Sequence, residues 1–162
     1  MATRARIGIQ QKSGRIIASY QHWDGYPGGL GVNLVENWED PKKVTRAIKL
    51  GDSSKWHQII GDKVDFDDRD NEMYEVQNVY YGRDRGEKNA GYRVYKDEAD
   101  YIKNGFHSGE QYVYLMKDAG ETDYMGKPKF SWFYVESRYT EDGKEVIDDA
   151  FKPLEEDAIK DH

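Results

Sequence analysis

The chain has 162 residues, which is enough for one domain of ordinary size and too few for two. A charged fraction of 34% and a net charge of −7 make it polar, yet 14% of its residues are aromatic, which excludes wholesale disorder. The absence of cysteine excludes disulfides, thiolate metal ligands and cysteine nucleophiles. We therefore expect a single domain, residues 1–162. The sequence predicts no membrane span and no signal peptide, and together with the absence of cysteine this favours a location in the cytoplasm.

The charge is divided unevenly along the chain. Residues 1–61 carry a net charge of +4, and residues 62–162 carry a net charge of −11. Proteins that bind nucleic acids without sequence specificity usually carry a positively charged surface that contacts the phosphates. General nucleic-acid binding is therefore not expected of this chain.

The first elements predicted are two strands of a β-hairpin. Residues 4–10 alternate between polar and apolar side chains, and Ser13-Gly14 supplies a two-residue turn because glycine can adopt a positive φ. This turn sets a register in which Ile7 lies opposite Tyr20, so both strands bury the same face.

A pair of helices is predicted over residues 29–50. Helical spacing puts three large apolar residues on one stripe: Leu30, Leu34 and Trp38. Asp40 is a favourable N-cap for the second helix, and Pro41 suits its first helical position. Gly51 follows the last turn, where a left-handed residue commonly ends a helix.

The rest of the chain predicts short strands and short helices. Strand patterns cover residues 73–81, 91–95, 111–116 and 130–136, and Asp97 can cap a short helix that ends at Gly105. Residues 82–90 and 117–129 are expected to be loops. The pattern of residues 144–160 is helical, and the acidic segment 136–162 is expected to be partly mobile. Together these elements predict an α+β fold with a largely antiparallel sheet, an N-terminal hairpin, a helix pair and short C-terminal helices.

The loop that follows the hairpin is the first candidate site. It contains His22, Trp23, Asp24 and Tyr26 beside flexible glycines. As a ligand pocket, the aromatic rings would stack on a planar group while the imidazole and the carboxylate form hydrogen bonds with it. As a structural corner, the aromatic residues would anchor the chain and Asp24 would cap a turn. Both interpretations stay open at this point.

A charged segment after the strand pattern at 73–81 is the second candidate. Arg83 and Arg85 flank Asp84, and Glu87 follows. Two arginines can clamp a phosphate or a carboxylate through paired hydrogen bonds, or they can form salt bridges that hold a loop. Since each candidate segment follows a strand of one small sheet, we expect His22, Trp23 and Asp24 to lie within side-chain reach of Arg83 or Arg85.

Three motifs together resemble a family of uncharacterised proteins found mainly in tailed bacteriophages and in their bacterial relatives. The matching segments are His22–Pro27, Leu50–Ser54 and Arg83–Glu87, and the resemblance covers about the first 90 residues. It implies a phage setting, with no established activity and no catalytic residue that can be carried over.

No metal site or cofactor is expected. The acidic run 65–72 resembles a calcium loop, but it lacks the glycine at the sixth position. The four histidines have no short metal-ligand spacing, and neither a phosphate-binding loop nor a nucleophile elbow occurs.

The leading hypothesis is a phage-encoded accessory protein that acts by binding a small anionic or nucleotide-like molecule, or a host protein. One alternative is a hydrolase of a phosphorylated small molecule, with His22 as acid or base and Asp24 or Glu87 as its partner. Another is an acidic mimic that occupies a host nucleic-acid-binding protein through residues 136–162. Binding is favoured over catalysis because the sequence offers no evident nucleophile, metal site or paired base.

Overall fold

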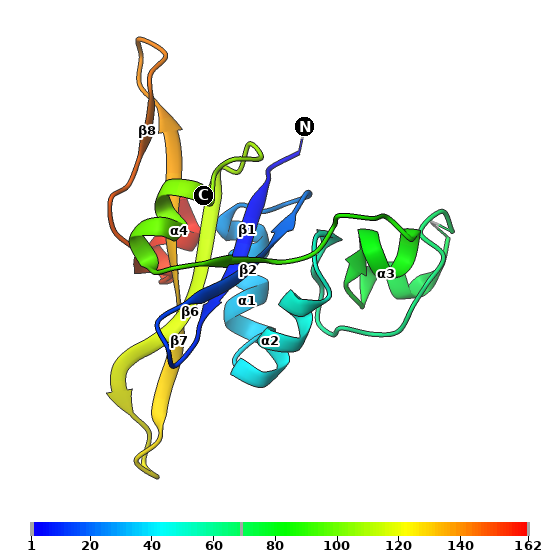
Figure 1. Cartoon of the computed structure of the whole chain (residues 1–162), viewed down its shortest axis with the longest axis horizontal. Coiled ribbons are helices and arrows are strands. Elements are labelled where there is room, and N and C mark those ends of the chain that lie inside the picture. Colours follow the sequence, from blue (N-terminus) through cyan, green and yellow to red (C-terminus); the bar gives the residue numbers. More distant parts are fainter. Residues whose placement is uncertain (1, 69, 162) are drawn as a thin grey trace.

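Residues 2–68 and 70–161 are described by a computed structural model, in which nine strands form one sheet with helices on both faces (Figure 1). The strands are β1 (Ala5–Gln10), β2 (Ile16–Gln21), β3 (Ser53–Lys55), β4 (Val79–Tyr80), β5 (Arg93–Tyr95), β6 (Tyr112–Thr122), β7 (Pro128–Tyr139), β8 (Glu145–Ile147) and β9 (Lys152–Pro153). The α-helices are α1 (Val32–Asn37), α2 (Pro41–Lys49), α3 (Tyr81–Arg85), α4 (Glu98–Asn104) and α5 (Glu156–Asp161). A π-helical turn, η1 (Pro27–Gly31), precedes α1, and a 3-10 turn, η2 (Glu72–Glu75), precedes β4.

The sheet is largely antiparallel, as the sequence predicts. Its strand order is β4-β3-β2-β1-β6-β7-β8, with β5 paired to β2 and β9 paired to β7. Two neighbouring pairs are parallel, β1 with β6 and β2 with β3. The α+β fold class, the N-terminal hairpin and the helix pair are therefore confirmed.

The register of the hairpin differs from the predicted one by a single residue. Ile7 lies opposite Ser19, because the loop between the strands is one residue longer than a two-residue turn. The backbone N–H of Gln11 donates to the carbonyl of Arg15, and Gly14 supplies the positive φ of 90°. As a one-residue shift exchanges the faces of a strand, Tyr20 lies on the face opposite to Ile7.

The face of the sheet that carries Ile7 is covered by α1, α2 and α5, and the main apolar core lies there. The predicted stripe is confirmed: Leu30, Leu34 and Trp38 are all buried. Asp40 caps α2 by accepting a hydrogen bond from the backbone N–H of Lys42, and Gly51 has the left-handed φ of 93° that ends the helix.

A smaller core lies on the opposite face, beneath α4 (Figure 1). Asp97 caps α4 as predicted, by accepting from the backbone N–H of Asp100. Tyr101 packs so closely on β1 that a Cβ at Gly8 would lie 2.8 Å from its hydroxyl oxygen. The Tyr101 hydroxyl donates to the carbonyl of Tyr114, which ties α4 to β6.

Several predicted boundaries are wrong. The strand expected over 73–81 is reduced to β4, because η2 occupies its first half. The loop expected over 82–90 begins with the helical turn α3, and the loop expected over 117–129 shrinks to a short turn between long strands. The helix expected over 144–160 is limited to α5, because β8 and β9 add to the edge of β7.

Replacing Trp38 tests the main core. Trp38 is fully buried, its ring lies 4.5 Å from that of Trp56, and its indole N–H donates to the carbonyl of His57. Trp38→Ala is expected to lower the free energy of unfolding by about 3–5 kcal/mol, measured by urea denaturation, because it leaves a large cavity. The control Trp23→Ala removes a ring that is 44% exposed and should cost less than about 1 kcal/mol. A small effect of Trp38→Ala would contradict the assigned packing.

Candidate functional site

The loop 22–27 is held rigidly where it leaves β2. The backbone N–H of Gly25 donates to the carbonyl of Thr3, and its own carbonyl accepts from the hydroxyl of Tyr114. A Cβ at Gly25 would lie 2.6 Å from the Cβ of Ala5, so only glycine fits there. The aromatic loop predicted from the sequence is therefore pinned in place by its backbone.

Asp24 and Tyr26 line a narrow cavity of about 160 Å³ beside β3. Asp24 has a φ of 55°, a left-handed conformation that is uncommon for a non-glycine residue. Its carboxylate lies 2.7 Å from the ammonium group of Lys55. Since both side chains are partly exposed, this ion pair orients the loop more than it stabilises the fold.

The side chains of His22 and Trp23 contact residues other than Asp24 and Lys55. The Nδ1 atom of His22 lies 2.7 Å from the hydroxyl oxygen of Tyr20, and the ring of Trp23 meets the imidazole edge-on at 4.7 Å. Partial burial, together with Arg4, lowers the pKa of His22. The carboxylate partner expected for His22 is not Asp24, which pairs with Lys55.

The side chains of Arg83 and Asp84 form hydrogen bonds that connect α3 to the neighbouring backbone. The buried carboxylate of Asp84 accepts from the backbone N–H groups of Val64 and Tyr80 and from the Arg83 guanidinium. Arg83 also donates to three carbonyls, those of Ile60, Gly61 and Asn78. The pair of Arg83 and Asp84 is therefore an internal brace that holds neighbouring backbone segments together. This arrangement agrees with the salt-bridge interpretation of the motif, in which the arginine holds a loop.

Arg85 and Glu87 form an exposed ion pair beside this brace. The Arg85 guanidinium carbon lies 4.8 Å from the ring centroid of Phe66 and 4.6 Å from that of Tyr81. Such cation–π contacts hold the side chain against aromatic rings. Of the four charged residues in the motif Arg83–Glu87, only Arg85 and Glu87 have exposed side chains.

The two predicted segments do not form one site. Strand β2 runs parallel to β3 and β4 runs antiparallel to it, so the chain leaves β2 and β4 at opposite ends of β3. Within residues 2–68 and 70–161, no hydrogen bond, ion pair or ring contact joins segment 22–27 to segment 83–87. The expected joint site is therefore wrong, because strand direction separates the loops.

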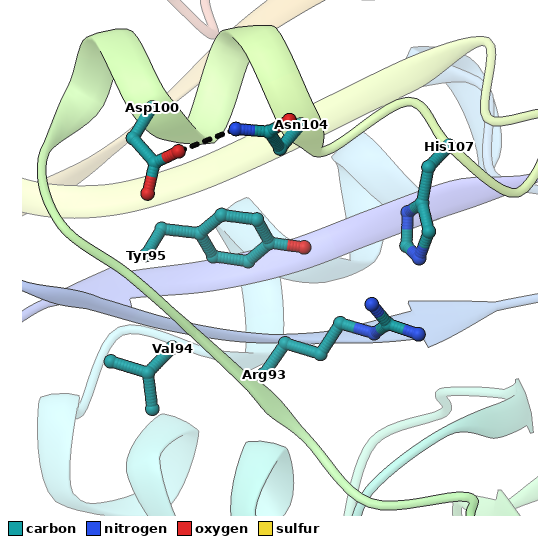
Figure 2. A pocket seen from close by; sticks show the side chains of 6 residues that line it. All are labelled: Arg93, Val94, Tyr95, Asp100, Asn104 and His107. Carbon is teal, nitrogen blue, oxygen red and sulfur yellow. Dashed lines mark hydrogen bonds between the residues drawn. The ribbon is translucent and has the colours of Figure 1, made fainter.

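The structure places a more open cavity, of about 520 Å³, on the face of the sheet that carries α4 (Figure 2). Strand β5, helix α4 and the turn after α4 supply its lining: Arg93, Val94, Tyr95, Asp100, Asn104 and His107. Figure 2 shows the Arg93 guanidinium and the His107 imidazole at one end, Asp100 at the other, and the Tyr95 ring between them.

Tyr95 is the buried element of this cavity. Only 5% of the residue is exposed, and its ring lies 4.8 Å from that of Tyr101. Among the described residues, its hydroxyl oxygen has no hydrogen-bond partner. Burial raises the pKa of Tyr95, so the hydroxyl stays protonated and can donate a hydrogen bond.

A buried ion pair holds the turn that carries His107. The Nε atom of Arg6 lies 2.7 Å from a carboxylate oxygen of Glu110, and it also donates to the carbonyl of Gly105. The other oxygen of Glu110 accepts from the backbone N–H of Ser108. Because Arg6 belongs to β1, this pair fixes the turn after α4 to the centre of the sheet.

The electrostatic surroundings keep His107 neutral near pH 7. Partial burial, then Arg6 and Arg93, lower the pKa of His107, while Glu110 and Asp52 oppose that shift. Asp52 is half-buried and accepts from the backbone N–H of Tyr20, and burial raises its pKa. The cavity thus combines a guanidinium, a hydroxyl donor and an imidazole that can gain a proton on mild acidification.

Part of this site could have been found from the sequence. The predicted strand 91–95 places Arg93 and Tyr95 on one face because side chains alternate along a strand. Nothing local indicates that His107 joins them, since its turn is positioned by Arg6 and Glu110, which lie 104 positions apart.

No protein family, curated protein or solved structure matches the chain. None of the helices in residues 2–68 and 70–161 has the length and apolar character needed to cross a lipid bilayer. Over the same residues, no group of three or more His, Asp or Glu side chains is arranged to hold a metal ion.

Arg83→Ala is expected to destabilise the fold, by about 3 kcal/mol in urea denaturation, because it leaves the Asp84 carboxylate buried without its cation. Arg85→Ala is the matched control from the same helix. Its guanidinium is exposed, so the loss should stay below about 1 kcal/mol. Equal losses for the two variants would contradict the brace.

Proposed function

We propose that the protein binds a small anion, or the anionic group of a small molecule, in the cavity between Arg93, Tyr95 and His107. The observation that carries this proposal is that Tyr95 lines the cavity while its buried hydroxyl has no hydrogen-bond partner among residues 2–68 and 70–161. A buried polar group left unpaired costs roughly 1–3 kcal/mol, and almost all such groups in native proteins are paired. A ligand that accepts from this hydroxyl would remove that cost.

The other groups at the same end of the cavity favour an anionic acceptor. The planar guanidinium of Arg93 can donate two parallel hydrogen bonds to a carboxylate or a phosphate. His107 lies beside it in Figure 2 and can add a third donor. Asp100 at the far end would repel a second negative charge, which favours ligands whose charge is confined to one end.

Binding is favoured over hydrolysis at the sites described. His22, the acid or base of the hydrolase hypothesis, contacts Tyr20, while Asp24 and Glu87 pair with Lys55 and Arg85. Segment 136–162, the acidic surface of the mimic hypothesis, contributes to β7, β8, β9 and α5. In this proposal the protein is a phage-encoded accessory protein, and its ligand is met in the host cytoplasm.

Sulfate is a suitable probe, with binding followed by amide chemical shifts of the labelled protein. Arg93→Ala should weaken sulfate binding about tenfold, equivalent to about 1.4 kcal/mol. Tyr95→Phe should weaken it several-fold while leaving the melting temperature unchanged or raised, because over residues 2–68 and 70–161 the hydroxyl has no hydrogen bond to lose. Arg46→Ala removes an exposed arginine on α2 and is the matched control. Loss of stability in Tyr95→Phe, or equal binding by all variants, would refute the proposal.

Sulfate affinity should also rise as the pH falls from about 7.5 to about 5.5. The pKa of His107 lies below its ordinary value, so the imidazole is neutral at the higher pH and gains positive charge on acidification. The charge of sulfate is constant over this range, so the change reports on the protein. We expect an increase of about fivefold, abolished in His107→Gln and retained in Asp52→Asn. Persistence of the increase in His107→Gln would assign it to another group.

A further inference from the structure

Residues 117–131 form a hairpin arm that extends beyond the body of the protein (Figure 1). Pairing between β1 and β6 ends at Met116, and β9 pairs with β7 only at Phe133 and Tyr134. In the described chain, neither edge of the arm is therefore covered by another strand. At its tip, Tyr124 is 96% exposed and Met125 is 67% exposed.

A groove of about 780 Å³ lies where this arm joins the body. Its apolar lining comes from α1, the start of α2, both arm strands and the segment before α5: Val35, Pro41, Met116, Phe130, Trp132, Pro153 and Leu154. Val35 and Phe130 are both more than a third exposed. The groove is the largest apolar concavity among the cavities described above, and neither predicted segment contributes to it.

The groove is bordered mainly by negative charge. Four acidic residues and one lysine belong to its lining: Glu39, Glu121, Asp123, Glu155 and Lys129. Within residues 2–68 and 70–161, none of these five takes part in an ion pair. An apolar floor inside an acidic border complements a segment that is both apolar and basic.

A free strand edge runs along the same groove. The carbonyl of Trp132 accepts from the backbone N–H of Leu154, so the backbone of Trp132 faces that edge. Backbone groups alternate along a strand, so Phe130 presents its N–H and C=O to the same side, where pairing with β9 has ended. Extended peptides commonly add to such an edge while their side chains fill neighbouring pockets.

We propose that this groove binds an extended segment of a partner protein in which lysine or arginine alternates with bulky apolar residues. Backbone hydrogen bonds at Phe130 would align the segment, the apolar residues would fill the groove, and the basic residues would face Glu39, Glu121 and Glu155. A second copy of this chain is a poorer occupant, because its net charge of −7 would face the same acidic border.

The test uses two short capped peptides, one alternating lysine with leucine and one alternating glutamate with leucine. The lysine peptide should shift the amide signals of Ala119, Phe130 and Ser131 and bind at least about tenfold more tightly than the glutamate peptide. Glu121→Lys should weaken the lysine peptide several-fold. Glu141→Lys makes the same change of charge at the exposed turn between β7 and β8 and should leave binding unaltered.

Phe130→Ser provides a second variant, since its ring is 37% exposed and its removal should leave the melting temperature nearly unchanged. Weakened peptide binding by this variant supports the proposal. Three results would overturn it: equal binding of the two peptides, signal shifts away from the groove, or binding that Glu121→Lys and Glu141→Lys weaken equally. Dimerisation that Phe130→Ser abolishes would also overturn it, because a second copy would then be the occupant.

Discussion

The buried ion pair between Arg6 and Glu110 governs how the two halves of the chain meet. Arg6 is 1% exposed near the start of β1, and Glu110 is 3% exposed just before β6. Burial is the largest influence on the pKa of Arg6 and lowers it, but Glu110, Tyr95 and Tyr101 together outweigh burial, so the pKa is raised and the guanidinium stays charged. A buried charge that lost its partner would be strongly destabilising. The pair therefore requires β1 and the turn after α4 to lie side by side.

The position of Arg6 also affects the cavity lined by Arg93, Tyr95 and His107. The guanidinium of Arg6 uses Nε for Glu110 and Gly105, while its Nη1 atom is buried with no partner among the described residues. The Tyr95 hydroxyl on the same face likewise has no hydrogen-bond partner within this described part of the chain. Two buried donors near one cavity, with Arg93 and His107 at its mouth, create a region that favours negative charge. The same face buries fewer apolar groups than the other, so the sheet separates a packing face from a polar one.

The acidic second part of the chain supplies strands β4 to β9 of the sheet and helices α3, α4 and α5, and its end does not form a separate tail. Several of its acidic side chains pair with lysine or arginine, as Asp148 does with Arg138. The acids that line the groove are different, because they form no ion pair within the described residues and surround exposed apolar side chains. The proposed anion site and the proposed peptide groove consequently lie in surroundings of opposite electrostatic character.

Features set by a few neighbouring residues could be predicted from the sequence. The caps at Asp40 and Asp97, the left-handed Gly51 and the buried stripe of Leu30, Leu34 and Trp38 all depend on spacing within one or two helical turns. The rigidity of the loop at Gly25 was decided by the tertiary structure, because its backbone bonds with Thr3 and with the distant Tyr114. The pairing of distant strands could not be predicted from the sequence. One additional residue in the hairpin loop moved Tyr20 to the other face of the sheet. The directions of β2 and β4 along β3 separate segment 22–27 from segment 83–87. The partnership of Arg93, Tyr95 and His107 arises only when β5 joins β2 and Arg6 meets Glu110, because contacts between distant residues leave no periodic signature in the chain.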